Sequence, residues 1–250
     1  MDRRSEALAQ LQPYITQART FSGSVYPVDV RPVDPGPPWD YEAIARDHAW
    51  RAGTVLDLGT GGGEVLSRIV DGLPARVVAT EEWQVNAPVA RRRLSPLGVR
   101  VVRARSLRLP FAAGTFDLVL DRHEELDPAE VARVLAPEGR VVTQQCGPDD
   151  WAELWRFFPR EHSFGDHFAD YGAGFRAAGL AVSGIRHYRK VAFRRLGDLV
   201  YMLLVSPEMI PSFDPAQDID ALLALEAGCR TPDGIVLTES RYLLQAESRR

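Results

Sequence analysis

The feature that most constrains this chain is a glycine cluster in the stretch TVLDLGTGGGEVLSRI, residues 54–69. An apolar run that ends in the cluster indicates a buried strand, and the pattern that follows Glu64 indicates a helix. A strand, a glycine-rich turn and a helix bring backbone close to a ligand at the carboxyl edge of a parallel sheet. We therefore expect an α/β domain with a ligand held at this turn.

Strands and helices alternate along the middle of the chain. The expected strands are 54–58, 76–80, 99–103, 116–120 and 140–144, and the expected helices between them are 64–71, 86–97 and 127–135. Asp127 as N-cap and Pro128 at the first helical position mark the start of the last of these helices. The alternation predicts parallel βαβ units in a doubly wound sheet with helices on both faces.

The two ends of the chain are less regular. Residues 5–20 are predicted to be a helix that kinks or breaks at Pro13. Residues 25–41 are rich in proline and hold Tyr26, Trp39 and Tyr41, which fits a surface linker and a ligand lid equally well. We expect residues 1–50 to form N-terminal helices and this lid. Residues 51–250 would then form the α/β core, with a helical cap insert at about 190–232.

Composition excludes several classes of protein. With 45% hydrophobic and 26% charged residues, the 250-residue chain has an ordinary globular balance. Its net charge of −4 gives no overall attraction to nucleic acid. Cys146 and Cys229 fit neither a disulfide framework nor a metal-binding spacing, so no metal site is expected. We find no apolar signal core and no apolar run of membrane-spanning length, and we expect a cytoplasmic protein without membrane contact.

The glycine spacing favours one class of ligand. Gly59, Gly61 and Gly63 run G-x-G-x-G, whereas the dinucleotide fingerprint is G-x-G-x-x-G. Glu64, in the first turn of the helix, would repel a pyrophosphate there but not an ammonium or sulfonium group. Glu81 ends the next strand, where a carboxylate can accept hydrogen bonds from both ribose hydroxyls. The pattern favours a cationic, zwitterionic nucleoside over a dinucleotide.

With these residues the chain resembles the class I S-adenosylmethionine-dependent methyltransferases. VLDLGTGGGE is similar to their glycine motif, and VVATEE is similar to the strand that ends in the ribose acid. RSLRLPFAAGTFDLVLDRHE resembles the adenine loop and fourth strand, and VARVLAPEGRVVTQQ resembles the next helix, turn and fifth strand. The resemblance implies a mostly parallel, seven-stranded sheet and S-adenosylmethionine as the cofactor.

The resemblance also implies a set of cofactor-binding residues. They are Asp57, Gly59, Thr60, Gly61, Glu81, Glu82, Ser106, Leu107 and Asp121. Gly59 and Gly61 would approach the methionine part, Glu81 the ribose, and Ser106 and Leu107 the adenine. One position departs from the family pattern: Arg105 stands where many members have an aspartate that accepts from the adenine amino group. Arginine has no acceptor, so adenine must be recognised by backbone groups, stacking or another side chain.

Methyl transfer asks mainly for alignment and exclusion of water, and it has no obligatory catalytic motif. The active-face residues expected at the end of the fourth strand are Asp121, Arg122, His123 and Glu124. His123 is the candidate base because its ordinary pKa lies near neutrality, and Arg122 is the second catalytic candidate. The alternative for His123 is a hydrogen-bonding link between the loop and the next helix. The predicted substrate-binding residues are Trp39, Tyr41 and Gln144.

The sequence leaves three functions open. The first is methyl transfer to an oxygen or nitrogen nucleophile of a small molecule. The second is methylation of rRNA or tRNA, with the basic stretch at residues 186–195 as a local track for phosphates. The third is an S-adenosylmethionine-binding protein that does not transfer a methyl group. His162 and His167 could line a pocket with Tyr171, although we expect surface or helix-capping groups rather than a metal site. The oligomeric state is not indicated.

Overall fold

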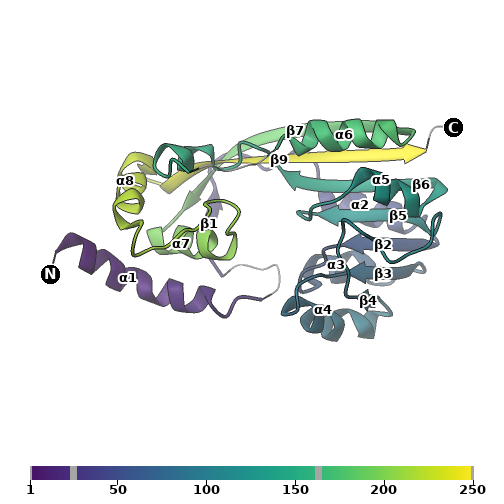
Figure 1. Ribbon diagram of the computed structural model, residues 1–250, viewed down its shortest axis with the longest axis horizontal. Helices are drawn as coiled ribbons and strands as arrows, with labels where there is room; N and C mark the ends of the chain where they lie inside the picture. The colour runs from purple at the N-terminus through teal and green to yellow at the C-terminus, as the bar shows by residue number, and fades with distance from the viewer. Residues whose placement is uncertain (1, 23–26, 161–164, 249–250) are drawn as a thin grey trace.

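The fold is a mixed β-sheet with helices packed on both faces (Figure 1). The computed structural model describes residues 2–22, 27–160 and 165–248. The strands are β1 (Val30–Pro32), β2 (Thr54–Leu58), β3 (Arg76–Thr80), β4 (Arg100–Val102), β5 (Phe116–Arg122), β6 (Leu135–Cys146), β7 (Leu180–Phe193), β8 (Arg230–Thr231) and β9 (Gly234–Ser248). The helices are α1 (Arg3–Ala18), α2 (Tyr41–Ala49), α3 (Glu64–Val70), α4 (Asn86–Leu94), α5 (Pro128–Val134), α6 (His167–Ala177), α7 (Leu196–Val205) and α8 (Ile219–Cys229), with 3₁₀ turns η1 (Ser95–Leu97) and η2 (Ala152–Arg156).

The strand order confirms the predicted doubly wound sheet. It runs β1-β7-β9-β6-β5-β2-β3-β4, with β8 paired to β9. Strands β2 to β6 are parallel, and β7 and β9 form an antiparallel pair beside β6. The seven strands from β7 to β4 are the predicted sheet, and β1 and β8 are added to it. Pro32 fits in β1 because this short strand lies at the edge of the sheet, where a missing N–H costs no ladder bond.

Each face of the sheet has its own apolar core. On one face, α2, α3 and α4 bury residues such as Ala45, Leu66 and Leu94 against β2 and β5. On the other, α5 and α6 bury residues such as Val131 and Phe175. The carboxyl ends of β2, β3 and β5 therefore converge at one edge, with the glycine turn between β2 and α3.

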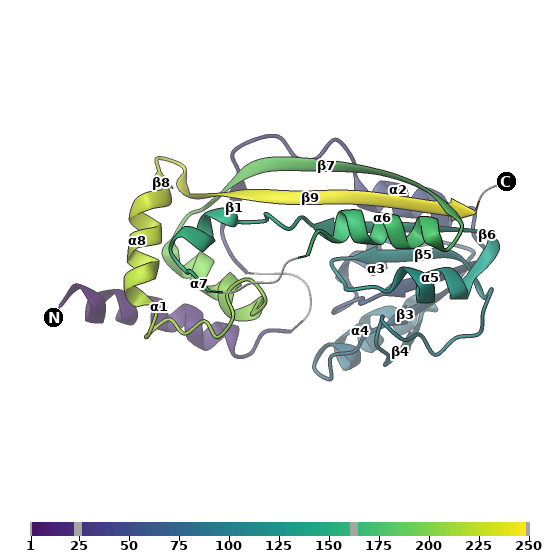
Figure 2. The same cartoon turned by 45° about the horizontal axis from the view of Figure 1, so that its top comes forward.

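A second lobe stands beside this core and is joined to it by the long β7–β9 pair (Figures 1 and 2). We call it the cap lobe: α1, α7, α8, β1, β8 and the adjoining ends of β7 and β9. Its core contains Leu11 of α1, Leu199 of α7, Leu222 of α8 and Leu237 of β9. The N-terminal helix and the cap insert, more than 150 residues apart in sequence, thus share one apolar core.

Pro13 does not break α1, which continues to Ala18. The residue is exposed, so the carbonyl four residues earlier can be solvated instead of hydrogen-bonded.

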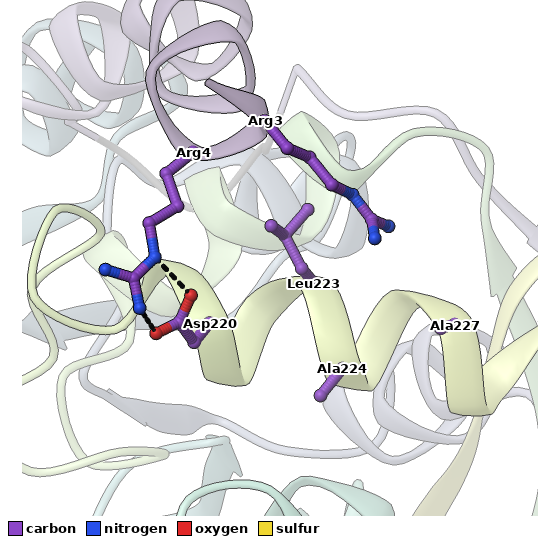
Figure 3. A pocket seen from close by; sticks show the side chains of 6 residues that line it. All are labelled: Arg3, Arg4, Asp220, Leu223, Ala224 and Ala227. Atoms are coloured by element: carbon purple, nitrogen blue, oxygen red, sulfur yellow. Dashed lines mark hydrogen bonds and ion pairs between the residues drawn. The ribbon is translucent and has the colours of Figure 1, made fainter.

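A surface hollow of about 470 Å³ lies between α1 and α8 at the outer end of the cap lobe (Figure 3). Arg4 Nε donates to Asp220 Oδ1 at 2.7 Å across it, and Leu223 and Ala224 form part of its wall. It does not adjoin the glycine turn, and the pair across it holds α1 against α8.

Candidate cofactor and substrate site

The glycine turn is open because its glycines have a backbone conformation that other residues rarely adopt. Gly59, Gly61 and Gly63 have φ of 55°, 61° and 80°. The Thr60 N–H donates to the Thr80 carbonyl at 2.9 Å, which fixes the turn to the end of β3. A Cβ at Gly59 would lie 2.3 Å from Glu124 Oε2, so this glycine also allows a close approach by a carboxylate.

Glu81 is held rigidly at the end of β3. Its Oε2 accepts from the Gly61 N–H and its Oε1 from the Trp83 N–H, both at 2.7 Å. The side chain is buried beside the turn. A carboxylate oriented by two backbone amides is a preorganised acceptor, because each oxygen keeps lone pairs for a ligand hydroxyl.

Glu64 contributes less negative charge to the turn than the sequence indicated. Its Oε1 lies 2.5 Å from Arg93 Nη1, and the same guanidinium donates to the Gly62 carbonyl. This pairing offsets the repulsion that we expected for a pyrophosphate. The charge that selects the ligand must come from other carboxylates.

Those carboxylates are Asp57, Glu81, Asp121 and Glu124, which we call the carboxylate cluster. Burial, followed by the charges of Glu124 and Glu81, raises the pKa of Asp57 to about 7. Burial also raises the pKa of Asp121 well above its ordinary value, although Thr143 Oγ1 and Gln145 Nε2 donate to its Oδ2 at 2.8 and 2.6 Å. Elevated carboxyl pKa values mean that negative charge is poorly compensated here, so a cationic ligand would be favoured.

Glu124 is a member of this cluster that the sequence analysis placed on the active face without a role. Ser106 Oγ donates to its Oε1 at 3.1 Å, and its backbone N–H donates to Asp121 Oδ1 at 3.2 Å. Burial, followed by the charge of Glu81, raises its pKa to about 7. The only sequence signal for it is its place three residues after Asp121.

The adenine loop has a buried and an exposed side. Ser106 is buried, whereas Leu107 is 45% exposed. Arg105 Nε lies 2.6 Å from Glu82 Oε1, and both side chains are open to solvent. Glu82 therefore pairs with the residue that departs from the family pattern.

The predicted substrate-binding residues come together. Trp39 Nε1 donates to Gln144 Oε1 at 2.8 Å, which joins the proline-rich segment to β6. Tyr41, the first residue of α2, is 5% exposed, and its hydroxyl lies near the Asp121 backbone. Burial, followed by the charges of Asp57 and Asp121, raises the pKa of this hydroxyl. Tyr26 lies outside the described residues.

His123 follows β5 in a strained conformation, with φ of 65°. Its backbone N–H donates to the Gln144 carbonyl at 2.9 Å, and its Nδ1 lies 3.5 Å from Cys146 Sγ. Two causes lower the pKa of His123 well below its ordinary value: desolvation by the packed surroundings of the ring, and then the charges of Arg122 and Arg241. The residue as a whole is exposed. The imidazole is thus neutral at neutral pH. Burial raises the pKa of Cys146 to about 12, so its thiol stays protonated.

The basic stretch at residues 186–195 is largely paired with carboxylates. The pairs are Arg186 with Asp166, Arg189 with Glu239, Lys190 with Glu153 and Arg194 with Asp29. His167 is the first residue of α6 and stacks on Tyr171 with ring centroids 5.2 Å apart. His162 lies outside the described residues.

The described part of the chain has neither a candidate metal-binding cluster nor a candidate membrane-spanning helix. It contains no group of three or more histidine, cysteine or acidic residues that could hold a metal ion. None of its helices is both long and apolar enough to cross a membrane.

Comparison with known proteins identifies the class of the core. Residues 55–142, from β2 through most of β6, match the family model described as a methyltransferase domain. Together with the strand order, this match makes the stretch a class I S-adenosylmethionine-dependent methyltransferase domain.

Individual relatives are more distant. The chain is 35% identical over 106 residues to a demethylmenaquinone methyltransferase from Thermus thermophilus; the match covers 38% of this chain and spans about half (47%) of that protein's length. A functionally unknown protein from Deinococcus radiodurans R1 has a similar structure, with a TM-score of 0.65 and 15% identity over 95% of this chain and 100% of that one. The [4+2]-cyclase SpnF also has this fold, with a TM-score of 0.56 and 14% identity over 95% of this chain and 93% of that one.

Proposed function

We propose that the protein transfers a methyl group from S-adenosylmethionine to an oxygen or nitrogen nucleophile of a small molecule. The observation that carries the proposal is Glu81, held by the Gly61 and Trp83 amides inside a methyltransferase domain. A rigid acceptor beside a glycine turn suits the two ribose hydroxyls.

The residues of the site fit this cofactor. S-adenosylmethionine carries a sulfonium and an ammonium, and the carboxylate cluster has two members whose pKa is raised to about 7, Asp57 and Glu124. The bound cofactor would supply a methyl group activated by positive sulfur. The glycine turn and Glu81 would hold it, and Ser106 and Leu107 would border the adenine.

The chain's own residues would orient the acceptor and hold its proton. Trp39, fixed to Gln144, and the buried Tyr41 hydroxyl would line the acceptor's side of the site. His123, neutral at neutral pH, would accept the acceptor's proton at a ring nitrogen as the methyl arrives. Arg122 lies beside it at the end of β5 and would position a polar group of the substrate.

A small molecule is favoured over RNA as the acceptor. Four basic side chains of the 186–195 stretch pair with carboxylates of the protein, and a paired guanidinium offers less to a phosphate. The Thermus thermophilus relative is by its name a methyltransferase of demethylmenaquinone, which is a small molecule.

The test has a binding and a turnover arm. Calorimetry should show binding of S-adenosylmethionine and of its demethylated product, and no binding of NAD. Incubation with a labelled cofactor and a panel of hydroxylated and amine-bearing small molecules should give a labelled product. Binding of NAD alone would refute the proposal.

The turnover arm also separates methyl transfer from cofactor binding without it. A [4+2]-cyclase shares this fold, so tight cofactor binding by itself does not establish methyl transfer. Retention of S-adenosylmethionine without turnover of any panel member would favour the non-methylating alternative. Binding of RNA that weakens steeply with salt would favour the RNA alternative.

A further inference from the structure

We propose that Glu124 makes the site select S-adenosylmethionine over its demethylated product by carrying the carboxylate that faces the sulfonium. The inference rests on the proposed function and names a residue that decides which form of the cofactor is held. The methylated cofactor bears one more positive charge than the product, and the rest of the two molecules is shared.

The position of Glu124 carries the argument. One carboxylate oxygen accepts from Ser106 in the adenine loop, and the other lies against Gly59 of the glycine turn. The adenine is expected at Ser106 and the methionine part at Gly59, and the ribose and then the sulfur lie between them. The Glu124 oxygen that lies against Gly59 is thus on the sulfonium's side of the ribose.

Neighbouring groups leave the Glu124 charge without a cation. Its hydrogen bonds come from the Ser106 hydroxyl, a neutral group. The titratable groups that interact with it are Glu81 and Glu82 after β3, Glu125 of its own loop, and Asp57 and Asp121 of β2 and β5, all acidic. Glu82 is in turn paired with Arg105, which lies toward solvent.

Coulomb attraction decides between the two forms of the cofactor. A carboxylate near the sulfur stabilises a sulfonium and gains nothing from a neutral thioether. Asp57, Glu81 and Asp121 add to the same field, but Glu81 is bonded to two backbone amides and Asp121 to Thr143 and Gln145. The pKa of Asp57 is raised as much as that of Glu124, but Glu124 is the member that lies between the two cofactor-binding segments.

The test is a comparison of affinities in three proteins. Calorimetry would measure the dissociation constants of S-adenosylmethionine and of S-adenosylhomocysteine for the wild type, Glu124→Gln and Glu125→Gln. Glutamine keeps the size and can still accept from Ser106, while it removes the charge. Glu125→Gln removes the same charge from the adjacent, exposed residue and serves as the matched control.

We expect Glu124→Gln to lower the preference for S-adenosylmethionine by about tenfold, a change of about 1.4 kcal/mol. The affinity for the product should change much less, and Glu125→Gln should keep the wild-type preference. In the wild type the preference should also rise between about pH 6 and pH 8, as the Glu124 carboxyl ionises. That rise should be smaller in Glu124→Gln, in which Asp57 still titrates.

An unchanged preference in Glu124→Gln, or an equal loss of affinity for both ligands, would overturn the inference and leave the proposed function standing. A wild type that binds neither ligand would overturn both. Thermal denaturation checks that the variant folds: without ligand at pH 8 it should be at least as stable as the wild type, because it lacks an uncompensated charge.

Discussion

At the scale of single residues, the site is defined by acids that differ in how their charge is held. Glu81 receives two backbone N–H groups, whereas Asp57 and Glu124 have pKa values raised to about 7. The first arrangement orients a hydrogen-bond acceptor. In the second, the ionised carboxylates are destabilised by burial and by their neighbours' charges, and a bound cation would stabilise them. The two kinds of acid therefore predict different responses to mutation and to pH.

Replacing Glu81 by alanine should weaken cofactor binding by about 1–3 kcal/mol, since the ribose hydroxyls lose a charged acceptor. The Gly61 and Trp83 amides also lose theirs, so the glycine turn should loosen. Glu82→Ala is the comparison: this carboxylate pairs with Arg105 near solvent, and its loss should cost less. Calorimetry with the wild type and both variants measures the difference, and equal effects of the two substitutions would mean that Glu81 has no special role.

The raised pKa values of Asp57 and Glu124 predict how stability depends on pH. A carboxyl whose pKa is higher in the folded protein binds its proton more tightly there, so folding is favoured at low pH and loses stability as pH rises toward 7. The melting temperature of the ligand-free protein should fall between about pH 4 and pH 7 through these groups. The double variant Asp57→Asn, Glu124→Gln should show a weaker fall, and an identical fall would assign it to other groups.

His123 should show a catalytic role in its pH profile. If it accepts the substrate proton, His123→Ala lowers the rate by about 10²–10⁴-fold with cofactor affinity nearly constant. Because its pKa is lowered, the imidazole stays neutral to lower pH than usual. The wild-type rate should be constant through neutral pH and fall only in more acidic solution, where imidazolium cannot accept a proton.

His123→Asn separates this role from a positional one. Asparagine tolerates the positive φ of this position better than alanine does, so the loop geometry should survive. An asparagine variant that keeps most activity, with no acid limb in the wild-type profile, would leave alignment as the source of catalysis.

At the scale of elements, the contact between α1 and α7 decides how the cap lobe is held. The Tyr14 ring of α1 lies against Gly197 of α7, and a Cβ there would be 2.2 Å from Tyr14 Cε2. Gly197 is the second residue of α7, and its lack of a side chain permits the close approach of the two helices.

Gly197→Ala should therefore destabilise the protein by about 1–3 kcal/mol, because the ring must move and α1 must separate from α7. Gly172→Ala in α6 is the control, since a Cβ there meets only the flexible end of Arg176. That variant should be neutral or more stable, because alanine favours a helix. Urea unfolding measures both, and a stable Gly197→Ala would show that α1 packs more loosely than described.

How much could be predicted from the sequence depended on whether a signal was local. Neighbouring residues indicate the glycine turn after β2, the Glu81 carboxylate after β3 and the Asp127 cap of α5, and the structure contains all three. The Asp127 side chain accepts from the Ala129 N–H. The union of α1 with α7 and α8 was not foreseen, because Leu11 and Leu199 carry no mark that they share a core. The contacts of Glu124 were not foreseen for the same reason, since its partners Ser106 and Gly59 come from other segments.

At the scale of the whole molecule, the two lobes are joined through β7 and β9, and buried charges lie where this pair leaves the core. Arg241 of β9 bonds Asp150 at 2.7 Å and Glu239 at 3.0 Å, with the Arg241 side chain 16% exposed. Burial raises the pKa of Asp150 even though Arg241 lies beside it, so the desolvation cost of this group is large. The ion pairs at the junction therefore hold together charges that would be costly to leave alone.

Arg241→Met should accordingly destabilise the protein by about 3–5 kcal/mol, because Asp150 would stay buried without its cation, whereas Glu239 keeps Arg189. The double variant Arg241→Met, Asp150→Asn should recover part of this loss, since asparagine can still accept from the Ser240 N–H that Asp150 now binds at 2.7 Å. Urea unfolding of both variants measures the coupling. Arg241 also lowers the pKa of His123, so the acid limb of the rate profile should move to higher pH in Arg241→Met. A single variant as stable as the wild type would mean that water already reaches these charges. In that case the junction would be held by the β7–β9 ladder alone.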